Sequence, residues 1–185
     1  PVEKGDYFVQ AEGDISSAPE YPITEVQQRI AQNVASLIRD GDTIQLGIGS
    51  LPNACARNLM DKKDLGIHSE MFTNLMGTMV EKGVITGARK NLNPGKHIFC
   101  FAGGTNHLFD MLHEDPNCII RPASYVTDPM VIRQNDNMVS INALWKLTSP
   151  ARFAPSPSAP ASIPARAAHL TLLTVQPTVR AAAAF

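Results

Sequence analysis

The sequence has no excess of charge of either sign. Its 16 lysines and arginines nearly balance 17 aspartates and glutamates, which leaves a formal net charge of −1 over 185 residues. A basic patch of the kind that binds nucleic acid is therefore not expected. Long apolar runs are also missing: none approaches the ~20 residues that span a bilayer, and the polar opening stretch is not a secretory signal peptide. The composition indicates one soluble globular domain, with neither nucleic acid nor a membrane as partner.

Cysteine is scarce as well. Cys55, Cys100 and Cys118 are odd in number, far apart and flanked by apolar residues. This pattern predicts buried free thiols in a reduced cytoplasm rather than a disulfide framework. Metal-ligand spacing is also missing, so we expect no metal site and interpret four histidines as packing or surface residues: His68, His97, His107 and His113.

Acidic residues and glycine disappear from the last part of the chain. After Trp145 the sequence has no Asp, Glu or Gly and becomes rich in Pro, Ala and Ser, so residues 145–185 form a separate segment, the tail. Residues 1–22 are polar and irregular, which favours a linker, whereas 23–144 have the pattern of a compact domain. Because the chain opens with Pro1, we also expect a processed protein or a fragment.

Between the linker and the tail, short apolar strands alternate with helices. The first helix begins with a capping box, because Thr24 is followed three residues later by Gln27, and Gly41 stops it. This alternation predicts an α/β fold with a mostly parallel sheet and flanking helices. We expect strands over 43–49, 67–72, 97–103, 118–121 and 137–144, and helices over about 50–63 and 74–83 and after 105.

A loop with two glycines joins the first expected strand to the second helix. It reads Gly47-Ile48-Gly49-Ser50-Leu51-Pro52, and Ser50 is expected to cap the helix. Glycine lets the backbone approach a ligand closely, and free N–H groups at a helix start favour an anion or a developing oxyanion. A dinucleotide-binding fingerprint would need glycine where Pro52 stands, so that function is disfavoured. An ordinary tight turn is the alternative interpretation.

Glu70 is the second candidate, because a charged residue is rare in the middle of a central strand. Right-handed βαβ units bring the carboxyl ends of neighbouring parallel strands to one edge of the sheet, which would place Glu70 near Gly47 and Gly49. A carboxylate nucleophile next to N–H donors suits covalent catalysis with an oxyanion site. The alternative is a solvated glutamate on an edge strand. A third loop, expected at the same edge, contains Gly103, Gly104 and Thr105.

Five stretches of the sequence together resemble a known family. They are ASLIRDGDTIQLGIGSLPNA, DKKDLGIHSEMF, EKGVITG, the Gly-Gly-Thr loop and YVTDPMVIRQNDNMVSINAL. Over residues 24–144, their order and spacing are similar to the 4-hydroxybutyrate CoA-transferase and acetyl-CoA hydrolase/transferase family, which includes butyryl-CoA:acetate CoA-transferases. The resemblance implies two similar α/β domains with the active site between them, about twice this length in all. The chain would then be a truncated CoA-transferase-like domain.

The resemblance also implies roles for the candidate residues. Glu70, within GIHSEM, would attack an acyl-CoA thioester and then carry CoA as a glutamyl thioester, while Gly47 and Gly49 would lie in the oxyanion-binding loop. The loop over 103–105 would contact substrate or CoA. The partners would be an acyl-CoA and a short-chain carboxylic acid, with no cofactor beyond CoA as substrate, in a cytoplasmic protein that is a homo-oligomer at full length. Thr-Asn-Leu at 73–75 departs from the family's Ser-Asp-Gly-like stretch, so the acyl group stays open.

Two other functions stay open at this point. One is acyl-CoA hydrolysis on the same scaffold, in which water replaces the acceptor acid. The other is a non-catalytic binding module that kept the fold and lost the reaction. Because the resemblance places half of the cleft in a domain that is missing here, we expect little or no activity from the 185-residue chain itself.

We predict that the tail is the product of a frameshift near Leu144. Trp145-Lys146 must be encoded TGG-AAR, and reading one base earlier gives Met-Glu; permitted codons continue as MEVDLTGQVCSESIGPRQYSGTGG, which is similar to the family's continuation and its glycine-rich CoA loop. On this interpretation the tail is disordered and carries no site, whereas the alternative is a genuine Pro/Ala linker. Resequencing the gene tests the prediction: we expect a missing base near the Leu144 codon, and an intact frame would contradict it.

Overall fold

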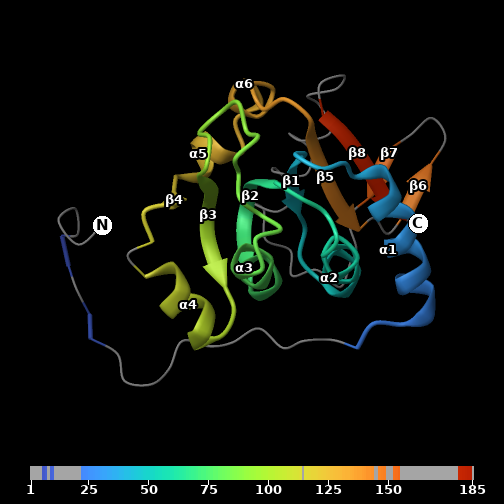
Figure 1. Ribbon diagram of the computed structural model, residues 1–185, viewed down its shortest axis with the longest axis horizontal. Helices are drawn as coiled ribbons and strands as arrows, with labels where there is room; N and C mark the ends of the chain where they lie inside the picture. The colour runs from blue at the N-terminus through green and yellow to red at the C-terminus, as the bar shows by residue number, and fades with distance from the viewer. Residues whose placement is uncertain are drawn as a thin grey trace.

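The computed structural model describes residues 6, 7, 9, 10, 22–113 and 115–143, and the backbone of 146–148, 152–154 and 179–184. Six strands form one sheet in the order β4-β3-β2-β1-β5-β8, and all neighbouring strands run parallel (Figure 1). The predicted α/β class with a mostly parallel sheet is thereby confirmed. The strands are β1 (Thr43–Leu46), β2 (Gly66–Thr73), β3 (His97–Gly103), β4 (Cys118–Ile120), β5 (Met138–Ala143) and β8 (Val179–Ala184).

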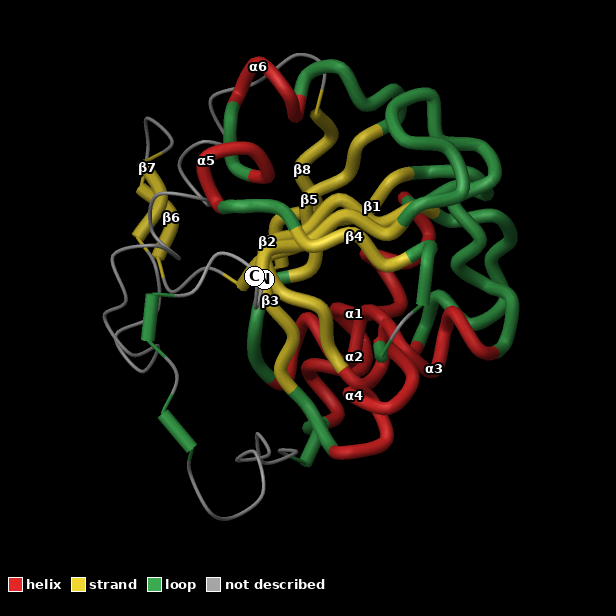
Figure 2. The backbone as a smooth tube through the Cα atoms, turned by 90° about the vertical axis from the view of Figure 1, so that its left-hand side faces the viewer, coloured by secondary structure: helices red, strands yellow, loops and turns green. Residues whose placement is uncertain are grey.

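Helices cover both faces of this sheet. Figure 2 shows α1 to α4 on one side and α5 and α6 on the other. Strands that are covered on both faces are nearly continuous apolar runs, and β1 is buried at all four of its residues. The helices are α1 (Glu25–Leu37), α2 (Ser50–Arg57), α3 (Asn74–Glu81), α4 (Asn106–Leu112), α5 (Ala123–Val126) and α6 (Pro129–Ile132).

The first helix begins at the predicted capping box. The Thr24 N–H donates to Gln27 Oε1 at 2.9 Å, and the Gln27 N–H donates to Thr24 Oγ1 at 3.3 Å. These two bonds satisfy N–H groups that a helix start otherwise leaves without a partner. α1 ends at Leu37, earlier than Gly41, because Ile38 is already in an extended conformation.

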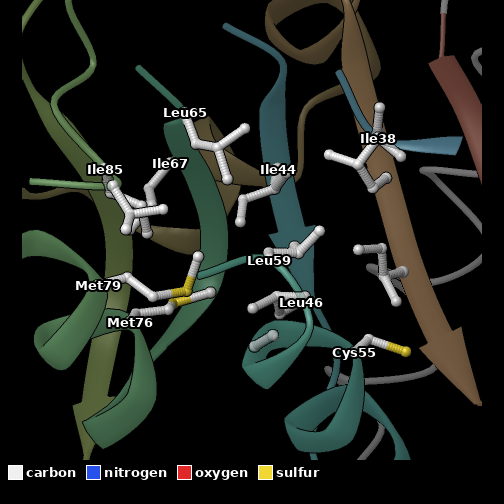
Figure 3. Close-up of a cluster of buried hydrophobic side chains, with 14 of the residues drawn as sticks. Ile38, Ile44, Leu46, Cys55, Leu59, Leu65, Ile67, Met76, Met79 and Ile85 are labelled. Carbon is white, nitrogen blue, oxygen red and sulfur yellow. The ribbon is translucent and has the colours of Figure 1, made fainter. Parts of the chain in front are cut away.

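The hydrophobic core lies between the sheet and α1 to α3 (Figure 3). Ile44 of β1 and Ile67 of β2 are fully buried there together with Met76 and Met79 of α3. Further along β2, Phe72 packs on Phe99 of β3 with their ring centroids 4.9 Å apart. Apolar side chains therefore hold β2 firmly on both sides of Glu70.

The second helix starts at its predicted cap residue, so the N-cap lies one residue earlier than expected. Gly49 is the N-cap residue and provides no side-chain bond, while Ser50 is the first helical residue. The expected cap is wrong because the Ser50 hydroxyl is used elsewhere: it accepts a hydrogen bond from Gln27 Nε2 at 2.8 Å, which joins α2 to α1. The first turn of α2 is consequently left without a side-chain cap.

The cysteine prediction is confirmed in one part and wrong in another. All three cysteines are free thiols and Cys55 is buried, but Cys100 and Cys118 are half-buried. Cys118 lies on the short strand β4 at the edge of the sheet. β4 pairs with β3 only as far as Phe99 opposite Ile120, so Cys100, one residue further along β3, has no strand on that side.

Parts of the tail have a described backbone. β6 (Lys146–Thr148) and β7 (Arg152–Ala154) form an antiparallel pair, and β8 pairs with β5. At these three strands the structure differs from the disorder that we expected, because a strand placed along β5 satisfies main-chain groups that an open edge would leave unpaired. The rest of the tail, like most of the linker predicted over 1–22, lies outside the described residues, so both predictions stay untested there.

One lysine is almost completely buried next to the core. Lys90 is 5% exposed, and its Nζ donates to the carbonyl oxygens of Ile67 and Lys96, each at 2.8 Å. Its stem runs over Gly66, where a Cβ would lie 2.5 Å from Lys90 Cγ. Burial lowers the pKa of Lys90 from 10.5 to about 8. This amine therefore links the segment between α3 and β3 to β2, and its burial makes it lose its proton at a lower pH than an exposed lysine does.

We predict that Lys90 makes stability rise with pH between about 8 and 10.5. In that window the unfolded chain binds the proton on this amine and the folded chain releases it, so the free energy of unfolding increases with pH. The gain relative to Lys90→Met is expected to reach roughly 3 kcal/mol across the window. Chemical denaturation of the two proteins from pH 7 to pH 10.5 measures it.

The matched control is Lys63→Met, which replaces an exposed lysine. Its difference from the unmodified protein is expected to stay constant over the same pH range. Equal pH dependence of the two variants would show that Lys90 is not responsible.

Candidate active site

The carboxyl ends of β1, β2 and β3 meet at one edge of the sheet. β2 lies between β1 and β3, so Glu70 is on a central strand and the edge-strand alternative is excluded. The β1–β2 pairing places Ile44 opposite Ile67, and further along β2 the Ser69 hydroxyl donates to the Leu46 carbonyl oxygen at 3.4 Å, so the end of β1 lies beside the residue before Glu70. The glycine loop therefore leaves β1 at the sheet edge towards which Glu70 lies on β2, and a direct approach of the two stays a prediction.

Glu70 is half-buried and has no ion pair among the described residues. Burial raises the pKa of its carboxyl group, because the charged form loses hydration. Ser69 pairs with Phe99 and Met71 with Phe101, so Cys100 is the residue of β3 next to Glu70. The pKa of Cys100 is raised to about 11 by burial and by the negative charge of Glu70. The raised pKa favours the protonated thiol, so the carboxylate is the more readily ionised of these two neighbouring side chains.

The two glycines of the β1–α2 loop differ in what their N–H groups can do. The Gly47 N–H donates to the Ile141 carbonyl oxygen of β5 at 2.8 Å and is not available to a ligand. Gly49 has a φ of +123°, and in the described part of the chain its N–H has no hydrogen-bond partner. The N–H groups that remain for an anion at this loop are therefore those of Gly49 and of Ser50 and Leu51 in the first turn of α2, and the anion site itself stays a prediction.

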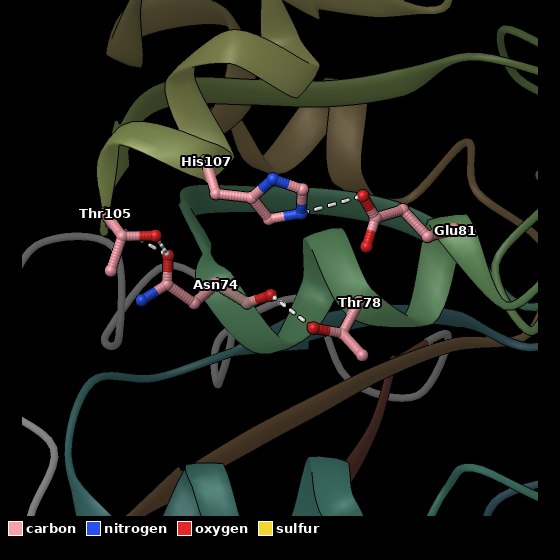
Figure 4. A network of polar contacts seen from close by, with 5 residues as sticks. All are labelled: Asn74, Thr78, Glu81, Thr105 and His107. Carbon is pink, nitrogen blue, oxygen red and sulfur yellow. Dashed lines mark hydrogen bonds and ion pairs between the residues drawn. The ribbon is translucent and has the colours of Figure 1, made fainter.

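The third loop is tied to the start of α3 by one side chain. Asn74 Oδ1 accepts hydrogen bonds from the Thr105 N–H at 2.9 Å and from Thr105 Oγ1 at 3.2 Å (Figure 4). A Cβ on Gly104 would collide with the side chains of Asn74 and Leu108, so a larger residue there would displace the asparagine that holds Thr105. Gly103 ends β3 at the same edge as Glu70. The structure thus brings the 103–105 loop to the predicted edge, through an asparagine that the sequence patterns did not identify as a site residue.

A groove of about 230 Å³ lies beyond this loop, between α3 and α4. Its lining includes Asn74, Thr105 and an exposed pair in which His107 Nε2 lies 2.9 Å from Glu81 Oε1 (Figure 4). Exposed pairs of this kind contribute little to stability. Glu70 does not line the groove, which therefore adjoins the candidate site without containing its reactive group.

The buried histidines serve packing, as predicted. His68 Nε2 donates to the Val126 carbonyl oxygen at 2.9 Å, and His68 lies against Tyr125 with a ring-centroid distance of 6.4 Å. Burial lowers the pKa of His68 to about 4 and also lowers that of His97, so both rings are neutral near pH 7. Within the described residues, no three His, Cys, Asp or Glu side chains come together as a metal-binding group.

A polar cluster that the sequence patterns missed lies beside the glycine loop. Gln45 of β1 and Ser140 and Asn142 of β5 hydrogen-bond to one another within otherwise apolar strands. The signal was present in the sequence, because Ser140 and Asn142 are two residues apart and therefore on one face of the strand.

In the described parts of the chain, no helix combines the length and apolarity that crossing a membrane requires.

Comparisons with known proteins lead to one family. Residues 104–153 match the family model for the acetyl-CoA hydrolase/transferase C-terminal domain. The chain is 43% identical to the 4-hydroxybutyrate coenzyme A transferase of Clostridium kluyveri, over 75% of this chain and 32% of the relative. It is 38% identical to the butyryl-CoA:acetate CoA-transferase of Anaerostipes caccae, over 64% of this chain and 27% of the relative.

Solved structures lead to the same family. RipA from Yersinia pestis superposes with a TM-score of 0.73 at 35% identity, over 76% of this chain and 33% of that structure. The 4-hydroxybutyrate CoA-transferase of Porphyromonas gingivalis superposes with a TM-score of 0.69 at 42% identity, over 74% of this chain and 35% of that structure. This chain thus spans about a third of the length of the relatives that it matches, and as a part of that size it belongs to the family of the acetyl-CoA hydrolases/transferases and 4-hydroxybutyrate CoA-transferases.

Proposed function

We propose that this chain carries the nucleophilic part of an enzyme that moves CoA between an acyl-CoA and a short-chain carboxylic acid. The observation that carries the proposal is the parallel pairing of β2, which holds the half-buried Glu70, with β1, which leads through the glycine loop into the uncapped start of α2 at the same sheet edge. The relatives' names support it, since those compared above are named as CoA transferases. Their names specify different acyl groups, so the class of substrate is a carboxylic acid and its CoA thioester.

The reaction runs through Glu70 in steps that conserve the thioester. A Glu70 carboxylate oxygen attacks the thioester carbonyl carbon, and the C–S bond breaks to give a mixed anhydride and CoA thiolate. The thiolate then attacks the Glu70 carbonyl carbon, which releases the donor acid as its carboxylate and leaves a glutamyl-CoA thioester. The acceptor carboxylate repeats the two steps in reverse order and departs as the new CoA ester. No proton, electron or phosphate has to be supplied.

The environment of Glu70 suits this role. Partial burial makes its carboxylate less well hydrated, and a less hydrated anion is a better nucleophile. The negative charge that develops on the thioester oxygen needs N–H donors that are already oriented. The Gly49 N–H and the first turn of α2 supply such donors, and the partial positive charge of the helix start adds to their effect.

Hydrolysis is the second candidate, because the matching family model includes hydrolases as well as transferases. Both reactions would pass through an adduct on Glu70, and they differ in whether water or an acid accepts the acyl or CoA group. Acyl exchange with a labelled carboxylic acid indicates the transferase, whereas net release of free CoA indicates the hydrolase. Binding of acyl-CoA with neither outcome would indicate a binding module.

We predict that Glu70→Gln abolishes exchange, because an amide cannot form the anhydride. The assay uses a chimera in which residues 24–143 replace the matching segment of the Clostridium kluyveri transferase, which supplies the remaining two thirds of the protein. Incubation of this chimera with acyl-CoA is expected to leave CoA on the peptide that contains Glu70, detectable by mass spectrometry. The unmodified 185-residue chain is expected to show no exchange by itself.

Glu81→Gln is the matched control, since Glu81 is an exposed glutamate at the end of α3. It is expected to leave exchange and adduct formation unchanged. CoA found on another carboxylate, or full activity of Glu70→Gln, would rule out the assignment.

We also predict that Gly49→Ala lowers the rate of adduct formation by up to ~10²-fold, the scale on which a lost oxyanion donor acts. A Cβ at this position meets open space, but the φ of +123° disfavours any side chain, so the substitution reorients the Gly49 N–H. Single-turnover kinetics of the chimera measure the rate. Gly95→Ala is the control, because Gly95 also has a positive φ, +72°, in open space and lies in the turn before β3. If both variants keep the full rate, the β1–α2 loop is an ordinary turn.

A further inference from the structure

A closed polar network lies between the carboxyl ends of β1 and β5. Gln45 is 6% and Ser140 is 4% exposed, and the two residues are direct neighbours in the β1–β5 pairing. Gln45 Oε1 accepts hydrogen bonds from Ser140 Oγ at 2.6 Å and from Asn142 Nδ2 at 2.8 Å. Asn142 Nδ2 also donates to Ser140 Oγ at 2.8 Å. The buried Gln45 and Ser140 are thus satisfied by each other and by the half-buried Asn142.

Burying such a network costs free energy, and its hydrogen bonds fix the orientation of each side chain once it has formed. Each polar group loses its hydration on burial, and only a complete set of partners offsets that loss. Apolar residues at the same positions would fill the space without this requirement. The retained polarity therefore indicates that the orientation of at least one of these side chains matters.

The member that reaches the β1–α2 loop is Asn142. Its Oδ1 lies 2.6 Å from the position that a Cβ on Gly47 would occupy, so the amide takes the place of a side chain at residue 47. The Gly47 N–H is bonded to the neighbouring Ile141 carbonyl oxygen at 2.8 Å. β5 thus holds residue 47 by its main chain and by the Asn142 amide. Gly49 follows two residues later, and in the described part of the chain its N–H has no hydrogen-bond partner.

We propose that Asn142, oriented by Gln45 and Ser140, is a positioning residue that sets the backbone of Gly47 and through it the direction of the Gly49 N–H. The proposal rests on the proposed function, since that N–H matters only if it faces a developing oxyanion. The proposal also explains why residue 47 is glycine. The Asn142 amide occupies the space that a side chain at residue 47 would need, so no approach of substrate is required to account for this glycine.

The first experiment uses the 185-residue chain and needs no activity. Amide hydrogen exchange is measured in the unmodified protein and in Asn142→Ala for two hydrogen-bonded amides of the loop: Gly47, which donates to the Ile141 carbonyl oxygen at 2.8 Å, and Asn53, which donates to the Gly49 carbonyl oxygen at 3.2 Å. Loss of the amide is expected to speed exchange at these positions by ~10-fold or more while the centre of β2 keeps its protection. The matched control is Asn91→Ala, which also removes an asparagine with two hydrogen bonds, to the Gln134 carbonyl oxygen and from the Asp136 N–H, far from this loop. Unchanged exchange in Asn142→Ala would overturn the proposal.

The second experiment measures single-turnover formation of the Glu70 adduct in the chimera. Asn142→Ala is expected to lower the rate ~10-fold to 10²-fold while the apparent affinity for acyl-CoA changes little, because the affected donor acts on the transition state. Gly47→Ala is expected to be equally slow, since its Cβ displaces the amide. The double variant is expected to be no slower than either single variant, because both changes remove the same contact.

The outcomes separate the proposal from the function on which it rests. If the losses in the rate of adduct formation add up in the double variant, the network has only a structural role. The same follows if Asn142→Ala keeps the full rate although its amide hydrogen exchange is altered. A chimera that forms no adduct on Glu70 at all would count against the proposed function. In that case the exchange data still decide whether Asn142 holds the loop.

Discussion

Parallel pairing of β1 with β2 on one side and β5 on the other is the constraint on which the site depends. Parallel strands end at the same edge, so the residue that follows each strand is placed without any long-range loop having to find it. Glu70 comes from β2, the glycine loop from β1 and Asn142 from β5. The core beneath them, from Ile44 to Phe72, holds the register, since a slip of one residue would turn every side chain to the opposite face.

The same edge concentrates groups that are costly to bury. Glu70 is half-buried without a cation beside it in the described part of the chain, and Gly49 leaves an N–H without an acceptor. A carboxylate and an N–H left in this state stabilise nothing in the folded protein, whereas under the proposed function each of them would gain an interaction when a thioester is attacked. Lys90 shows the contrast: it is more deeply buried, but its two carbonyl partners satisfy it and leave nothing for a ligand.

Sequence patterns predicted the alternation of strands and helices, the capping box of α1 and the parallel pairing of the strands that hold Glu70 and lead into the glycine loop. These features depend on local periodicity and on the rule that parallel strands share an edge. The patterns did not predict that Gly47 is bonded to β5, that Ser50 bonds to Gln27, or that Asn74 ties down Thr105. Each of these contacts joins residues at least 23 positions apart, and no local signal specifies which distant acceptor a given donor reaches.

The loop between β1 and α2 therefore contains two glycines for different physical reasons. Gly47 continues the direction of β1, where its neighbour across the sheet is Asn142, and the absence of a Cβ makes room for that amide. Gly49 turns the chain into α2 with a φ of +123°, which a residue with a side chain adopts only under strain. A substitution at residue 47 is thus a problem of packing that a change on β5 can relieve. A substitution at residue 49 is a problem of backbone conformation, and no change in a neighbouring strand removes it.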